Sequence, residues 1–152
     1  MAYRTHTLRR GRFSEIGRAY LITITTDKRH VRFMDWFQAR PVIEALKVAD
    51  QEMDVATYAW VVMPDHLHWL FSLRNRDLGS VVGRFKSRST LGYNRGVGRT
   101  GKLWQKGYHD SALRSEQAVR QAARYIVANP LRAGLVRRVG DYPMWDARWL
   151  AL

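Results

Sequence analysis

Hydrophobic positions along the chain follow two periods, and the order in which those periods alternate predicts the fold. Residues 19–26 are rich in β-branched side chains and alternate in part, which is typical of a strand. Residues 54–63 and 66–73 are apolar runs on either side of Pro64-Asp65, a pair suited to a tight turn, so we expect them to form a hairpin. Residues 103–113 predict a fourth strand, straight or bent.

Three other segments repeat their apolar residues at the spacing of an α-helix. Residues 36–50 form one, with Asp35 as its cap; because Pro41 lies inside it, we expect the regular helix to begin near that proline. Residues 77–93 form a second. Residues 115–128 form a third, capped by Ser115 and stopped by Pro130. The apolar stripes are Val42, Ala45, Leu46 and Ala49; Leu78, Val81, Val82 and Phe85; and Val119, Ala122, Ala123 and Ile126.

The predicted order is strand, helix, strand, strand, helix, strand, helix and then a tail. This order indicates an α+β domain, a small antiparallel sheet with helices on its faces in a ferredoxin-like or RRM-like plan. Since no repeat or linker divides the chain, we expect residues 1–152 to form a single domain. Residues 1–12 would be a basic arm, and residues 131–152 a C-terminal tail packed back through Trp145 and Trp149.

Two of the five histidines, His66 and His68, stand one residue apart in the most apolar run of the chain. Successive strand side chains point to opposite faces, so both imidazoles share one face. Two imidazoles side by side on a rigid strand form a ready pair of metal ligands; a hydrogen-bonded structural pair is the alternative. If the hairpin loop has two residues, Met63 faces His66 and Val61 faces His68.

The same alternation sorts the other large side chains of the hairpin. Ala59 and Leu70 fall on the histidine face, and the opposite face carries Tyr58, Trp60, Leu67, Trp69 and Phe71. Because both faces are apolar, we expect the hairpin to lie at the centre of the sheet, covered on both sides. The remaining histidines fit simpler roles. We expect His6 and His30 at the surface, and His109 beside Asp110 in a structural role.

Charge points to an acidic partner. The chain has 26 Lys and Arg against 13 Asp and Glu, a net charge of +13, and 12% of its residues are aromatic. Arginines that hold phosphates and rings that stack on bases favour a nucleic-acid partner. The absence of cysteine excludes disulfides and thiolate metal sites. No apolar run is long enough to span a membrane and residues 1–12 do not resemble a secretory signal, so we expect a cytoplasmic protein without a membrane partner.

Basic residues gather on the second predicted helix and in the glycine-rich stretch that follows it, at Gly92, Gly96, Gly98 and Gly101. We expect this stretch to be a flexible basic loop that follows a phosphate backbone, with a plain linker as the alternative. The residues predicted to contact DNA are Arg84, Lys86, Arg88, Arg95, Arg99, Lys102 and Arg132.

Two blocks of sequence resemble a known family. Residues 62–69 read VMPDHLHW, with the form His–hydrophobic–His, and residues 125–136 read YIVANPLRAGLV. Together they resemble the signature blocks of the REP-associated tyrosine transposases, relatives of the HUH single-tyrosine transposases, over roughly residues 19–136. The resemblance implies the HUH endonuclease fold and an enzyme that nicks single-stranded DNA and transfers the strand.

The resemblance also implies a role for each matching residue. His66 and His68 would bind a divalent metal, Mg²⁺ or Mn²⁺, and Tyr125 would be the nucleophile that forms a 5′-phosphotyrosine. Asn129 matches a third metal ligand, which is usually glutamine in the mobile relatives. The implied substrate is single-stranded DNA folded into hairpins of repetitive extragenic palindromes, and the chain could act as a monomer or a homodimer.

Two other functions remain compatible with the sequence. A sheet bearing Tyr58, Trp60, Trp69 and Phe71 could stack bases in a non-catalytic nucleic-acid-binding module. A metal-dependent phosphodiesterase would use the two histidines with water as the nucleophile, and would not need Tyr125.

Overall fold

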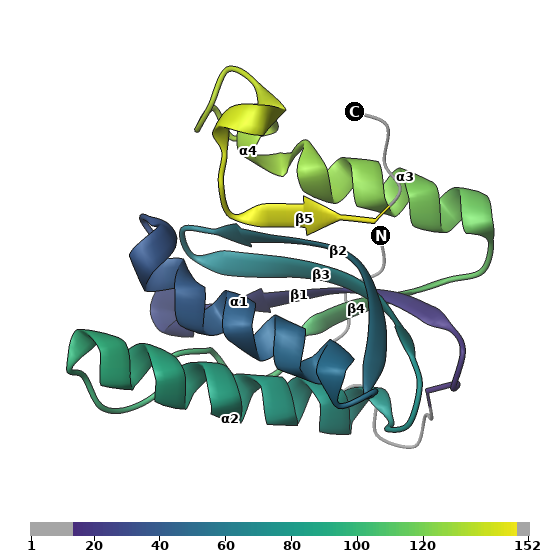
Figure 1. The fold of residues 1–152 in the computed structure, drawn as a ribbon, viewed down its shortest axis with the longest axis horizontal. Coiled ribbons are helices and arrows are strands. Elements are labelled where there is room, and N and C mark those ends of the chain that lie inside the picture. Colours follow the sequence, from purple (N-terminus) through teal and green to yellow (C-terminus); the bar gives the residue numbers. More distant parts are fainter. Residues whose placement is uncertain (1–13, 149–152) are drawn as a thin grey trace.

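Five antiparallel strands form one sheet in the order β4-β1-β3-β2-β5 in the computed structural model, which describes residues 14–148 (Figure 1). The strands are β1 (Ala19–Thr25), β2 (Val55–Met63), β3 (His66–Leu73), β4 (His109–Leu113) and β5 (Trp145–Ala147). The predicted α+β, ferredoxin-like plan is confirmed. Its central strand is β3, paired with β1 on one side and β2 on the other.

Helices cover both faces of this sheet (Figure 1). Helices α1 (Trp36–Gln51) and α2 (Leu78–Val97) lie side by side on one face, where Phe85 of α2 packs 5.2 Å from the ring of Trp69. Helix α3 (Glu116–Val127) covers the other face, and the short α4 (Asn129–Arg132) follows it directly. Two 3₁₀ turns, η2 (Asp27–Arg29) and η3 (Val139–Asp141), complete the described elements.

The hairpin has the predicted register, with Met63 opposite His66 and Val61 opposite His68. The alternation predicted for this strand is interrupted at Tyr58, where the register of β2 shifts by one residue between Thr57 and Ala59. This bulge inserts one extra residue into the strand. Tyr58 lines one cavity together with Val119 of α3 and another together with Trp60 and with Lys47 of α1.

Two helix boundaries differ from those the sequence predicts. Helix α1 begins at Trp36, ahead of Pro41, because the Asp35 side chain accepts a hydrogen bond from the amide of Gln38 and fixes the first turn. Helix α2 continues to Val97, beyond the predicted end at residue 93, so Gly96 is helical and the predicted loop is shorter. A Cβ atom at Gly92 would lie 3.1 Å from the Cβ of Pro41, so this glycine permits close packing of the two helices.

Residues 103–113 form a strand only in their last part, as β4, while Trp104 makes an isolated bridge to Thr26. The tail packs back as predicted and adds the fifth strand, which the sequence pattern did not reveal. Val62 donates its amide to the carbonyl of Met144, and the Tyr142 hydroxyl donates to the Val62 carbonyl at 2.6 Å. Burial raises the pKa of Tyr142 to about 12. The basic arm, His6 and Trp149 lie outside the described residues.

We predict that Tyr142→Phe lowers the free energy of unfolding by about 1–3 kcal/mol, because the Val62 carbonyl loses its buried donor. Urea unfolding followed by circular dichroism measures the change. Tyr125→Phe is the matched control, since it removes a hydroxyl from a ring that is 42% exposed and should leave stability unchanged. Equal stability of both variants would mean that the tail is not held by this bond.

Candidate active site

The two histidines of β3 meet at the end of the sheet nearest the hairpin turn. Their ring centroids are 4.9 Å apart and their planes lie at 83°. His68 is buried, whereas His66 is partly exposed. The placement follows from the pairing of β3 with both neighbours, which leaves its side chains only two faces to occupy.

Each histidine uses its Nδ1 atom in a contact that orients the ring. Nδ1 of His68 lies 2.9 Å from the Thr23 hydroxyl on β1, and Nδ1 of His66 lies 2.7 Å from a carboxylate oxygen of Asp65. Asp65 is held in turn by Arg29, whose guanidinium lies 3.2 Å from its other oxygen. With both Nδ1 atoms engaged, Nε2 of each ring is the atom left for a metal.

The charge state of His68 suits a metal ligand. Burial, with smaller contributions from the nearby His66 and Arg132, lowers the pKa of its imidazole to about 3. The ring is therefore neutral at physiological pH, which is the form that binds divalent metals.

Tyr125, on helix α3, contacts His68 across the interface between this helix and the sheet. Its ring lies 5.9 Å from that of His68, at 74°. The buried stripe of α3 turns toward the sheet as predicted, and Tyr125 stands at the edge of that stripe in the last turn of the helix, with 42% of its surface exposed. Helix packing thus places a phenol at the border between a buried imidazole and solvent.

Arg132 makes two contacts with Tyr125. Its guanidinium lies 4.1 Å from the centre of the Tyr125 ring, and one of its nitrogens donates to the Tyr125 carbonyl at 2.9 Å. The chain turns back through α4 to bring this arginine over the ring. The sequence predicted Arg132 as a DNA contact only, and its position beside both Tyr125 and His68 was not foreseen.

Asn129 lies one helical turn beyond Tyr125, where α3 gives way to α4. Its side-chain nitrogen is buried and has no hydrogen-bond partner. Rotation of the amide would exchange this nitrogen with the oxygen, the atom that binds metals. Among residues 14–148 no group of three or more His, Cys, Asp or Glu residues could hold a metal. The orphaned amide is compatible with a ligand role, and ligation by Asn129 stays a prediction.

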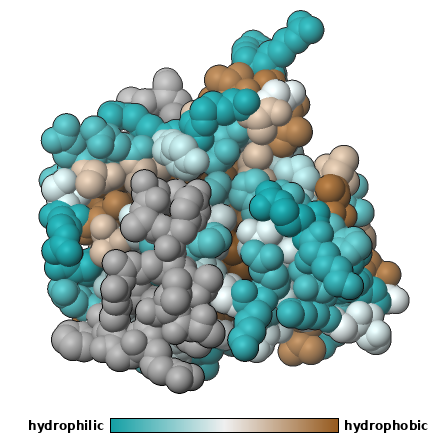
Figure 2. Space-filling view, turned by 180° about the vertical axis from the view of Figure 1, so that it is seen from behind, coloured by the Kyte–Doolittle hydropathy of each residue, from teal (hydrophilic) through white to brown (hydrophobic). Residues whose placement is uncertain are grey.

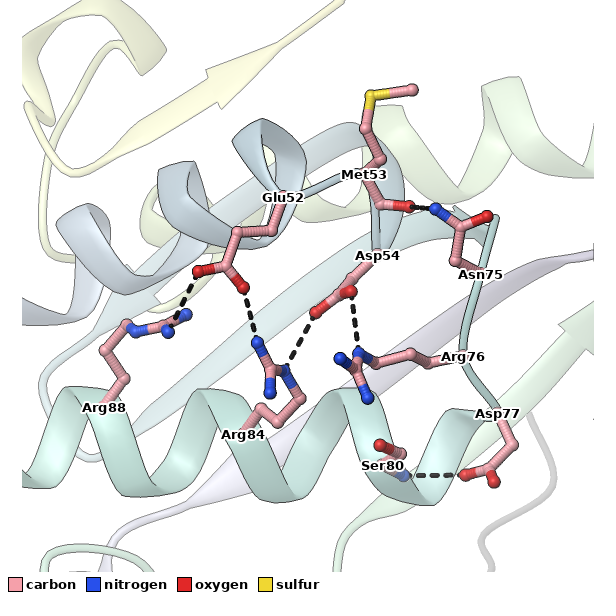
Figure 3. A network of polar contacts seen from close by, with 9 residues as sticks. All are labelled: Glu52, Met53, Asp54, Asn75, Arg76, Asp77, Ser80, Arg84 and Arg88. Atoms are coloured by element: carbon pink, nitrogen blue, oxygen red, sulfur yellow. Dashed lines mark hydrogen bonds and ion pairs between the residues drawn. The ribbon is translucent and has the colours of Figure 1, made fainter.

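The cationic residues on α2 make contacts within the protein. Arg84 and Arg88 both pair with Glu52, and Arg84 and Arg76 share the buried carboxylate of Asp54 (Figure 3). This network lies between α1 and α2, on the face of the sheet opposite Tyr125. A role in DNA binding stays a prediction for these arginines, whose charges are already compensated by carboxylates.

The remaining residues predicted to bind DNA divide in two groups. Lys86 donates to the carbonyls of Gln105 and Gly107, and Arg99 donates to Asn94 and to the carbonyl of Lys102. Arg95 and Lys102 are exposed, although Lys102 lies 3.8 Å from Asp27. Around Tyr125 the surface is mixed: exposed apolar side chains, Leu131 and Leu135 among them, gather over α4 and the segment after it (Figure 2).

The rings that would stack bases in a non-catalytic module are not available. Trp69 and Phe71 have no exposed surface and Trp60 is buried, because α1 and α2 cover that face of the sheet. The alternative of a non-catalytic module that stacks bases on these rings is therefore not supported, and the prediction that the hairpin is covered on both faces is confirmed. His30 is exposed as predicted, and no described helix is long and apolar enough to cross a membrane.

Sequence reasoning missed two residues of the site. Asp65 could have been found, because an acidic residue beside a strand histidine can orient its ring. Thr23 could not, because 45 residues separate it from His68 and only the register of β1 on β3 brings the two together.

Comparisons with known proteins show the family of the chain. The model of the family described as "Transposase IS200 like" matches residues 17–129. A REP-associated tyrosine transposase of Escherichia coli strain K12 is 31% identical over 87 residues, 56% of this chain and 50% of that protein, so the match spans half the length of that relative. A Haemophilus influenzae protein named for the same group is 24% identical over 138 residues, 84% of this chain and 78% of its own.

The fold also matches a solved structure. The structure of a REP-associated tyrosine transposase bound to a REP hairpin superposes with a TM-score of 0.72 at 23% identity, covering 88% of this chain and 79% of that one. This likeness shows the fold shared by the two chains.

We predict that the pH dependence of stability reveals the buried position of Lys86. Burial and the nearby Lys102 lower the pKa of the Lys86 ammonium from 10.5 to about 8. Between these pH values the unfolded chain binds a proton that the folded chain has released, so this group makes the free energy of unfolding rise with pH. We compare wild type with Lys86→Met by urea unfolding between about pH 8 and about pH 10. Over this range the free energy of unfolding of wild type should rise relative to that of the variant.

Lys106→Met is the control, because Lys106 is exposed and its difference from wild type should be constant over the same range. A constant difference for Lys86→Met as well would show that its ammonium keeps an ordinary pKa.

Proposed function

Because the chain belongs to the family of IS200-like transposases, we propose that it cuts single-stranded DNA and transfers the strand through a covalent bond to Tyr125. The observation that carries this proposal is the meeting of the Tyr125 ring with the His66–His68 pair at one end of the sheet. A nucleophile and two oriented imidazole donors within one site are what phosphoryl transfer requires.

In the covalent step the Tyr125 oxygen replaces the 3′ oxygen of the DNA on the phosphorus atom. The phenol oxygen of Tyr125 forms a bond to the phosphorus atom, and the bond between phosphorus and the 3′ oxygen breaks. The phenol proton leaves to solvent, to which Tyr125 is open, and the departing 3′ oxygen takes up a proton to become a free 3′-OH. The 5′-phosphotyrosine keeps the energy of the broken ester, so another 3′-OH can displace the tyrosine and restore a continuous strand without ATP.

His66 and His68 would hold the divalent metal, Mg²⁺ or Mn²⁺, with Asn129 as the candidate for a further ligand. When bound, the metal supplies positive charge for the phosphate oxygens as a Lewis acid. The protein's own part is orientation: Thr23 and Asp65 fix the two rings, and burial keeps His68 neutral.

Arg132 would prepare the nucleophile. Its guanidinium covers one face of the Tyr125 ring, and its bond to the Tyr125 carbonyl ties α4 to the last turn of α3. This cation–π contact holds the ring in position. The same charge attracts the phosphate that the phenol oxygen attacks.

The proposed substrate is single-stranded DNA that folds into hairpins of the REP type. The net charge of +13 supports a polyanionic partner, and the structural relative at TM-score 0.72 is described as bound to a REP hairpin. We propose that the protein acts in the cytoplasm, where such DNA is found.

We predict that Tyr125→Phe abolishes covalent protein–DNA adducts and leaves DNA affinity nearly unchanged, because the variant keeps the ring and loses only the nucleophilic oxygen. The measurement is a denaturing gel of protein incubated with labelled hairpin DNA and Mn²⁺. Tyr142→Phe, which also removes one hydroxyl, should still form adducts. Adducts that persist with Tyr125→Phe would remove Tyr125 from the mechanism, and free cleaved ends without any adduct would favour a phosphodiesterase that uses water.

We predict that Thr23→Val weakens Mn²⁺ binding by about 10- to 100-fold, because Nδ1 of His68 loses the hydroxyl that orients the ring. Isothermal titration calorimetry without DNA measures this affinity independently of activity. Thr100→Val, at an exposed position, is the control and should bind Mn²⁺ like wild type. Unchanged affinity in Thr23→Val would show that this contact serves the fold alone.

A further inference from the structure

Four large apolar side chains are exposed within seven residues at the start of α1. They are Val31, Met34, Trp36 and Phe37, which we call the α1 entry patch. Trp36 is 47% exposed and Phe37 is 67% exposed. The rest of the outward face of α1 is polar, at Arg40, Glu44 and Lys47, so the apolar surface is confined to the first turn of the helix. A local cluster of exposed aromatic and aliphatic side chains marks an interaction surface.

The patch is held rigidly. Phe33, which lies within it, is fully buried and packs 5.6 Å from the ring of Tyr93 and 5.5 Å from that of Trp104. The Tyr93 hydroxyl donates to the Arg32 carbonyl. Two hydrogen bonds fix the first turn: the Gln38 amide donates to the Asp35 carboxylate, and the Met34 amide donates to the Gln38 side-chain oxygen. The exposed rings therefore project from a fixed backbone, which reduces the entropy lost when a partner stacks on them.

The patch lies at the same end of the molecule as the candidate active site (Figure 1). The amides of Arg32 and Phe33 both donate to the carbonyl of Pro64, in the turn that precedes His66. Arg29 pairs with Asp65, which orients His66. A short chain of direct contacts thus leads from the start of α1 through the hairpin turn to the paired imidazoles.

The charges around the patch fit a polyanion. Residues 28–40 contain four cationic side chains and one carboxylate, and that carboxylate, on Asp35, is occupied as the cap of α1. The cationic side chains are Lys28, Arg29, Arg32 and Arg40. Rings set among arginines are the surface on which single-stranded DNA binds, with bases stacked and phosphates paired.

A second copy of this chain fits the patch poorly. Stable protein interfaces bury about 800 Å² on each partner, more than four partly exposed side chains can supply. Two copies meeting here would also bring their cationic side chains together.

We propose that Trp36 and Phe37 form a stacking platform for unpaired nucleotides that continue beyond the cleavage site, with Arg32 at their phosphates. This role rests on the proposed function, since it places the platform on the same DNA strand that Tyr125 attacks. The platform makes the protein select hairpins that carry a single-stranded extension over hairpins that end flush.

The test compares two labelled DNA probes, a hairpin with an unpaired extension and the same hairpin without it. Binding is measured by fluorescence anisotropy with the full chain and with metal chelated, so that no covalent product forms. The double variant Trp36→Leu/Phe37→Leu should weaken binding of the extended hairpin by about 5- to 150-fold and leave the flush hairpin unchanged. Trp36→Tyr/Phe37→Tyr keeps both rings and should bind the extended hairpin nearly as wild type does.

Ile16→Ala is the matched control, because Ile16 is an equally exposed apolar residue that precedes β1 at the other end of the sheet. Equal binding of the extended hairpin by wild type and the leucine variant would overturn the proposal, and so would an equal loss for both probes. A change of oligomeric state in sedimentation, with DNA affinity unchanged, would overturn it in favour of self-association.

The covalent adduct of the wild-type protein is scored separately with Mn²⁺. If adducts form while the leucine variant binds both probes normally, only the platform is wrong. If no adduct forms while the leucine variant still loses the extended probe, the proposed function fails and the platform stands as a site for single-stranded DNA.

Discussion

The pairing of β3 with both β1 and β2 is the constraint on which the site depends. A strand held on two sides cannot shift its register without breaking both ladders, and a shift of one residue would carry His66 and His68 to the face now occupied by Trp69 and Phe71. The apolar surfaces on both faces make such a shift costly. The same pairing sets Thr23 opposite His68, so one backbone arrangement places the imidazole and also orients it.

Helix α3 places Tyr125 in the site, and packing against the sheet fixes the position of this residue too. Its buried stripe fixes the rotation of the helix on the sheet, and that rotation leaves Tyr125 at the boundary of the stripe. A residue at this boundary contacts the protein on one side and solvent on the other. The phenol can therefore meet both His68 and a strand of DNA, while the short α4 returns Arg132 to the outer face of the ring.

Periodicity alone predicted the parts of the fold that local sequence determines. The alternation in the hairpin gave the register opposite His66 and His68, and Asp35 and Ser115 marked two helix starts correctly. The failures came from long-range packing. The bulge beside Tyr58 has no signature in the hydrophobic pattern, and Gly96 was assigned to a loop although it lies inside α2. The three residues of β5 are too few for a period to be detected.

The charged residues likewise show what the sequence alone cannot predict about function. The net charge of the chain indicates a polyanionic partner, but a sum over the sequence does not show which cations are available to it. On α2, Arg84 and Arg88 are compensated by Glu52 and Asp54, which lie more than 25 residues earlier in the chain (Figure 3). Near the hairpin turn and α4, Arg29 and Arg132 stand instead around the paired imidazoles and the phenol. Arg132 therefore keeps a charge that no carboxylate contacts in the described structure, whereas Arg29 pairs with Asp65 and the ion pairs of the opposite face hold α1 and α2 together.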